Sequence, residues 1–82
     1  MMQMYYSPRL LKSITQAPLS VQKVFYKQVR LLEQNLRHPS LKAKKYDESL
    51  NIWQARVNLS WRFYFRIEND VYYLLDVIPH PK

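Results

Sequence analysis

Between residues 53 and 78 apolar and polar side chains alternate, and this alternation constrains the fold more than any other feature of the sequence. It runs through three segments, 53–57, 61–67 and 71–78, which are separated by only a few residues each. A period of two is typical of β-strands with one buried face, and connections this short join strands as hairpins. We therefore expect a three-stranded antiparallel meander. Its core face would consist of Trp53, Ala55, Val57, Trp61, Phe63, Phe65, Ile67, Val71, Tyr73, Leu75 and Val77.

The number of residues in the first connection follows from the alternation, because residues directly opposite each other on antiparallel strands share one face of the sheet. An odd number keeps the two apolar faces on the same side. A connection of three residues, 58–60, places Val57 opposite Trp61 and keeps both on the core face. Arg56 then lies directly opposite Arg62 on the other face.

The second hairpin has two possible connections. A two-residue turn at Asn69-Asp70 would place Asp76 opposite Phe63 on the core face, and burying an unpaired carboxylate costs several kcal/mol. A three-residue loop, 68–70, avoids that cost and is the prediction. It places Arg62 opposite Asp76, and Tyr64 opposite Leu74.

Helical spacing and capping residues predict two helices before the meander. After a short strand over 2–6, Ser7 is a good N-cap, and Pro8 suits the first helical position. This helix ends before Pro18, and a second helix is predicted over 19–37 from apolar residues at three- and four-residue steps. The fold class is therefore α+β, with a helical hairpin packed on an antiparallel sheet.

Length and composition predict a single domain, 1–82, of a restricted chemical type. The chain contains no cysteine, which excludes disulfides and thiolate zinc sites, and no glycine, which excludes glycine-rich phosphate loops. No apolar stretch approaches the roughly 18 residues that cross a bilayer, and the first residues lack signal-peptide features. We expect a cytoplasmic protein without membrane contact.

The positive charge is concentrated in the first half of the chain. Residues 1–46 contain nine Lys and Arg and one acid, Glu33, whereas residues 47–82 contain four basic and five acidic side chains. Such asymmetry indicates a basic surface, densest in the segment 37–45. Nucleic acid is the first candidate for the partner, because neutralising phosphates releases counterions. The equally good alternative at this stage is a solvated basic linker or a surface that docks an acidic protein.

The predicted face of the sheet away from the helices collects chemically active side chains. Two opposed arginines, Arg56 and Arg62, repel each other unless an anion lies between them, and phosphate suits both. Asp76 is expected to pair with Arg62, and the imidazole of His80 can exchange a proton at neutral pH. The alternative is that these are solvated surface arginines and an inert histidine near the C-terminus. The two histidines lack metal-ligand spacing, so no metal is expected.

The C-terminal half resembles the RelE/ParE superfamily of bacterial type II toxins. The likeness rests on two stretches: Trp53-Gln-Ala-Arg-Val-Asn-Leu-Ser-Trp-Arg-Phe-Tyr-Phe and Leu75-Asp-Val-Ile-Pro-His-Pro-Lys. The element order of the whole chain also matches that family's compact α+β fold. The resemblance implies a ribosome-dependent endoribonuclease that needs no metal or cofactor, in which the ribose 2′-hydroxyl attacks the adjacent phosphorus.

The resemblance also implies roles for individual residues. Arg62, Arg56 and His80 would be catalytic: the arginines stabilise charge on the phosphate, and the histidine protonates the leaving 5′-oxygen. Asp76 and Glu48 would support them, with Glu48 and its neighbour Asp47 as candidates for the general base by position. The residues expected to bind mRNA or ribosomal RNA are Lys42, Lys44, Lys45, Tyr64, Arg66 and Lys82.

Partners follow from the same resemblance. A toxin of this kind would bind mRNA, the ribosome and a cognate antitoxin, and would be a monomer or weak dimer when free. Two alternatives remain at this stage: a ParE-like inhibitor of gyrase, which shares the fold and cleaves nothing, and a non-catalytic basic binding module.

Overall fold

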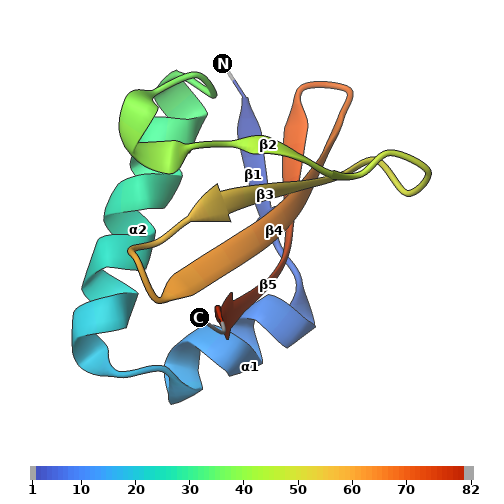
Figure 1. Ribbon diagram of the computed structural model, residues 1–82. Coiled ribbons are helices and arrows are strands. Elements are labelled where there is room, and N and C mark those ends of the chain that lie inside the picture. The colour runs from blue at the N-terminus through green and yellow to red at the C-terminus, as the bar shows by residue number, and fades with distance from the viewer. Residues whose placement is uncertain (1, 81–82) are drawn as a thin grey trace.

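The computed structural model describes residues 2–80 and contains two helices and a five-stranded sheet (Figure 1). The sheet order is β1-β5-β4-β3-β2; β1 runs parallel to β5, and all other neighbours are antiparallel. Helix α2 covers one face, and α1 lies beside β5. The α+β class, the N-terminal strand, the helix pair and the meander are therefore confirmed. The elements are β1 (Gln3–Tyr6), α1 (Pro8–Gln16), α2 (Leu19–Gln34), the 3-10 helix η1 (Pro39–Leu41), β2 (Lys44–Asp47), β3 (Ile52–Arg56), β4 (Trp61–Glu68) and β5 (Val71–Pro79).

Two boundaries differ from the prediction. Helix α2 ends at Gln34, where Asn35 is already extended, three residues before the expected end. The end of the basic segment begins the edge strand β2, which pairs with β3 and was not predicted. None of the helices in residues 2–80 is both long and apolar enough to cross a membrane.

The core lies between α2 and the sheet. The buried apolar face of α2 packs on the buried faces of β3 and β4, and the rings of Phe25 and Phe63 meet edge to face with centroids 5.4 Å apart. Such aromatic pairs add to the stabilisation from burial alone. The face of the sheet opposite α2 carries Lys44, Gln54, Arg56, Arg62 and Tyr64, and we call it the open face.

The first hairpin has the predicted register. Ala55 lies opposite Phe63, and Arg56 lies opposite Arg62. The backbone N–H of Val57 donates to the carbonyl of Trp61 at 3.0 Å, which closes the connection.

The second hairpin corrects the prediction. Its connection is the two-residue turn at Asn69 and Asp70, with φ of 49° and 64°, and not the expected three-residue loop. Both residues are left-handed, as in the turns that suit hairpins best, and Asn and Asp tolerate this conformation in a chain without glycine.

A β-bulge in β5 explains why this turn is possible. Leu74 lies opposite Phe65 and Asp76 opposite Tyr64, so Leu75 is an extra residue in the ladder. The bulge reverses the alternation within the strand and keeps Asp76 off the core face. Arg62 therefore lies opposite Ile78, and the predicted pairs of Arg62 with Asp76 and Tyr64 with Leu74 are wrong.

The two-residue turn and the bulge together determine which side chains of β5 reach the core. Tyr72 and Leu74 are buried there together with Val77, while Val71, Tyr73 and Leu75 are only partly buried. The core assignment was therefore wrong for these last three residues and correct for Val77.

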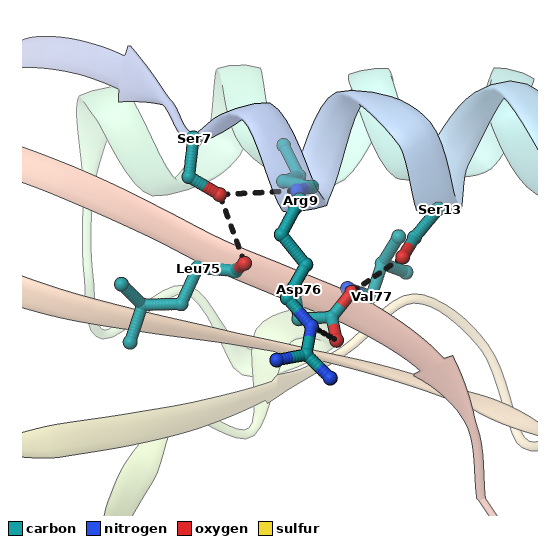
Figure 2. Close-up of polar contacts among 7 residues, drawn as sticks. Ser7, Arg9, Ser13, Leu75, Asp76 and Val77 are labelled. Atoms are coloured by element: carbon teal, nitrogen blue, oxygen red, sulfur yellow. Dashed lines mark hydrogen bonds and ion pairs between the residues drawn. The ribbon is translucent and has the colours of Figure 1, made fainter.

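Helix α1 holds the bulge in place (Figure 2). The Ser7 hydroxyl accepts from the backbone N–H of Leu10 at 3.0 Å, as the predicted N-cap, and donates to the carbonyl of Leu75 at 2.9 Å. Two residues of α1 then bind the carboxylate of Asp76: Ser13 Oγ donates at 2.6 Å, and Arg9 Nε lies at 3.2 Å. The start of α1 is thereby tied to the irregular part of β5.

Replacing Ser7 tests this link. Ser7→Ala removes the N-cap and the bond to the bulge carbonyl, so we expect the free energy of unfolding to fall by about 1–2 kcal/mol. Urea denaturation followed by circular dichroism measures it. Ser20→Ala on the exposed surface of α2 is the control and should change stability by less than about 0.5 kcal/mol. Equal effects of the two changes would contradict a special role for Ser7.

Candidate functional site

The open face is hollowed, where β3 ends and β4 begins, by a depression of about 340 Å³. Its lining residues are Lys42, Lys44, Gln54, Arg56, Arg62 and His80. We call it the basic hollow, because all of them except Gln54 have basic side chains. The structure thus brings together the three predicted catalytic residues and two of the lysines predicted to bind RNA. They come from β2, β3, β4 and the segments after η1 and β5.

Arg62 is the most constrained of these side chains. It is only 7% exposed, and its Nη1 donates to the carbonyls of Asn58 at 2.7 Å and Trp61 at 3.1 Å. The Asn58 side chain in turn accepts from the backbone N–H groups of Ser60 and Trp61, which orders the loop. Within residues 2–80 the hydrogen bonds of Arg62 all use Nη1, so Nε and Nη2 remain for a ligand.

No carboxylate neutralises the basic hollow in the described part of the chain. The ion pairs among residues 2–80 join Asp76 to Arg9, Glu48 to Lys45 and Glu68 to Arg66, and none of these residues lines the hollow. The predicted support of Arg62 by Asp76 is therefore wrong, because α1 takes that carboxylate. Several uncompensated cations around one depression favour an anionic ligand.

His80 reaches the basic hollow by an extension of β5. Its backbone N–H donates to the carbonyl of Ser60 at 2.7 Å, which continues the pairing beyond Pro79, and His80 lines the hollow together with the arginines. The other histidine is local structure, as expected: His38 Nδ1 accepts from the backbone N–H of Ser40 and caps η1.

Gln28 fixes the backbone beneath the hollow, and the sequence reasoning missed it. This glutamine of α2 is 5% exposed, and its Nε2 donates to the carbonyls of Arg56 at 2.9 Å and Ser40 at 3.1 Å. It thereby joins the end of β3 to η1, which precedes Lys42. A lone polar residue on the apolar face of a helix was the signal that could have identified it.

The remaining predicted residues within 2–80 do not line the basic hollow. Lys45 lies over the ring of Trp53, 5.3 Å from its centroid, and forms an ion pair with Glu48 at 3.7 Å. Glu48 is not a lining residue. Arg66 pairs with Glu68 at 2.9 Å and lines a different depression. Lys82 lies outside the described residues.

Asp47 is also committed elsewhere. Hydrogen bonds from the Ser49 hydroxyl at 2.8 Å and the Leu50 N–H at 3.1 Å hold the pKa of Asp47 below its ordinary value. Its carboxylate therefore stabilises the β2–β3 turn. Over residues 2–80 no group of three or more His, Asp and Glu side chains is arranged to hold a metal ion.

Gln54 lines the basic hollow and connects it to Tyr64. Gln54 Nε2 donates to the Tyr64 hydroxyl at 3.0 Å, so the predicted RNA-binding Tyr64 contacts a lining residue without being one. Alternation alone places Gln54 on the same face as Arg56, and this signal could have identified it.

The Gln28 anchor yields a prediction. Gln28→Met leaves the carbonyls of Arg56 and Ser40 without this donor, and we expect a loss of about 2–4 kcal/mol in the free energy of unfolding. Gln22→Met is the matched control, because Gln22 Nε2 donates to the carbonyls of Ala17 at 2.9 Å and Thr15 at 3.5 Å, which are remote from the hollow. Gln22 is less buried than Gln28, so we expect a loss of about 1 kcal/mol or less. Thermal or urea denaturation of both variants measures the difference, and comparable losses would contradict the anchor.

Among the comparisons with known proteins, only the one with solved structures finds a match, and it supports the fold. No family model and no curated protein matches the chain. Among solved structures, a YoeB/ParE toxin from Agrobacterium tumefaciens superposes with a TM-score of 0.81 at 10% identity, over 98% of this chain and 100% of that one. The archaeal RelE in its complex with RelB from Pyrococcus horikoshii OT3 gives 0.80 at 14% identity, over 95% and 93%.

A third solved structure is the YoeB dimer from Staphylococcus aureus, with a TM-score of 0.79 at 14% identity over 98% of both chains. The three superpositions cover almost the whole of each chain, and they agree with the helix pair and the five-stranded sheet described above. The protein therefore has the fold of the RelE/ParE toxins.

Proposed function

We propose that this protein is the toxin of a type II toxin–antitoxin system and that it cleaves mRNA on the ribosome without a metal. The observation that carries the proposal is the basic hollow, where Arg56, Arg62 and His80 surround one depression with no carboxylate from residues 2–80. The similar structures are toxins by their names, some of them bound to an antitoxin, and this supports the same role and partner here.

The proposed reaction is a transesterification within the RNA strand. The ribose 2′-hydroxyl gives its proton to solvent water and attacks the adjacent phosphorus, a cyclic phosphate forms, and the bond to the 5′-oxygen breaks. The pentacoordinate phosphorus carries extra negative charge, which Arg62 and Arg56 face with guanidinium groups. His80 gives a proton to the departing 5′-oxygen, and such acid help is worth about 10²–10⁴ in rate.

The position of Arg62 suits this role. Because loop carbonyls hold Nη1, the guanidinium is already oriented before RNA binds. A preorganised cation stabilises developing charge without the cost of reorganisation during the reaction. Since no acidic side chain of residues 2–80 lines the hollow, the rate gain rests on the arginines and the histidine.

The lack of a carboxylate base also favours a second candidate, a ParE-like inhibitor of gyrase that cleaves nothing. The two functions differ in their products. Ribonuclease activity leaves mRNA fragments with free 5′-hydroxyl ends at ribosomes, whereas gyrase poisoning leaves DNA damage and intact mRNA.

Arg62→Ala tests the ribonuclease directly. We expect at least about a 100-fold loss of mRNA cleavage and loss of growth arrest when the protein is induced without antitoxin. Arg62→Lys keeps the positive charge but lacks the planar guanidinium that can donate two parallel hydrogen bonds to phosphate, so it should retain only part of the activity. Mapping mRNA 5′ ends after induction measures cleavage, and circular dichroism checks folding.

Arg30→Ala is the control for this experiment, because Arg30 is an exposed residue of α2, outside the open face. It should leave cleavage unchanged. Full growth arrest by a well-expressed Arg56→Ala, Arg62→Ala double variant would remove the ribonuclease assignment, and DNA damage without mRNA fragments would assign gyrase instead.

His80→Ala isolates the acid. The side chain is exposed and outside the core, so the variant should fold normally. We expect cleavage to slow by about 10²–10⁴ while RNA binding changes little. Single-turnover cleavage on purified ribosomes measures the rate, and an unchanged rate would rule out a role for this imidazole in the chemistry.

A further inference from the structure

A second depression lies beside the basic hollow on the open face. It measures about 280 Å³, and its lining is mostly apolar and aromatic: Tyr46, Ile52, Tyr64, Leu75, Asp76 and Ile78. We call it the aromatic hollow. The carboxylate of Asp76 is already bound by Ser13 and Arg9, so within the described chain this hollow carries no uncompensated charge.

The two hollows adjoin each other on the open face of the sheet. Gln54 of the basic hollow donates to the hydroxyl of Tyr64, which lines the aromatic one. Along β4, Arg62 and Tyr64 are two residues apart on the same face, a separation of roughly 6–7 Å. A ligand held by its anionic group at Arg62 therefore reaches the tyrosines with its neighbouring group.

The aromatic hollow exposes a ring that has no partner on its outer side within residues 2–80. Tyr46 is 61% exposed, although its ring packs edge to face against Tyr64, with centroids 5.0 Å apart. Tyr64 is partly buried and fixed by Gln54. The pair therefore presents one exposed aromatic surface on a fixed support, next to unpaired cations.

We propose that the aromatic hollow is a nucleobase subsite, in which the base of the nucleotide whose phosphate occupies the basic hollow packs on Tyr46 and Tyr64. Proteins that bind single-stranded nucleic acid combine a cationic track with exposed aromatic rings on a sheet surface. Both parts are present here, and Ile52, Leu75 and Ile78 complete an apolar floor. The proposal rests on the proposed function only in taking RNA as the ligand.

Tyr46→Ala tests the subsite with an RNA hexamer that carries 2′-O-methyl groups, because this probe lacks the attacking hydroxyl and stays intact. Stacking of one base contributes enough that its loss should weaken hexamer binding about 5- to 100-fold. Tripolyphosphate has no base and should bind the variant as it binds the original protein. Tyr46→Phe keeps the ring and should retain hexamer affinity. Fluorescence anisotropy for the hexamer and calorimetry for tripolyphosphate supply the measurements.

Tyr5→Ala is the matched control, since Tyr5 is 50% exposed on β1, at the far edge of the sheet, and packs on Tyr73. It should leave hexamer binding unchanged. Equal losses from Tyr5→Ala and Tyr46→Ala, or no loss from Tyr46→Ala, would overturn the subsite. So would loss of antitoxin binding by Tyr46→Ala with full hexamer affinity, which would assign the hollow to a protein.

The subsite and the proposed function fail separately. If the protein causes no mRNA cleavage but binds the hexamer through Tyr46, the ribonuclease is wrong and the subsite stands. If it cleaves mRNA and Tyr46→Ala binds and cleaves normally, the ribonuclease stands and the subsite is wrong.

Discussion

The architecture depends on how the Ser7 hydroxyl joins the first helix to the bulge in β5. That hydroxyl caps α1 and donates to the carbonyl of the extra residue, Leu75. The two-residue turn directs Leu74 into the core, and the bulge that follows reverses the alternation, so that Asp76 turns to α1 instead. Without this reversal, the tight turn at Asn69 and Asp70 would direct the carboxylate into the apolar interior. The functional consequence is that Arg62 lies opposite Ile78, and no acid from residues 2–80 neutralises its hollow.

Sequence reasoning succeeded where local rules and tertiary packing agree. The first hairpin followed from parity alone, which correctly set Arg56 opposite Arg62. The second failed because counting by twos assumes an uninterrupted ladder, and nothing near Leu75 signals an extra residue. Strand β2 was missed for a different reason: Lys44-Lys45-Tyr46-Asp47 is a charged edge strand, whose polar composition resembles that of a linker.

The candidate site was predictable to a similar extent. Face alternation grouped Arg56, Arg62 and His80, and the structure places them around one hollow. Contacts that depend on where the helices dock were out of reach of that argument. Asp76 binds Ser13 and Arg9 because α1 crosses that end of β5, and Gln28 holds the Arg56 carbonyl because α2 passes beneath β3. A periodic pattern can single out a residue such as Gln28, but it does not identify the partner of a long-range polar contact.

The outer edge of β2 has a consequence for a chain that carries so many apolar side chains. A free strand edge is a template for pairing with another molecule and hence for aggregation. Here that edge is only four residues long, contains two lysines, and is interrupted by a register shift between Lys45 and Asp47. Shortness, charge and irregularity are the features by which natural sheets discourage edge-to-edge stacking. The irregular strand that presents Tyr46 to the open face thus also has the features that disfavour pairing between the sheets of two copies.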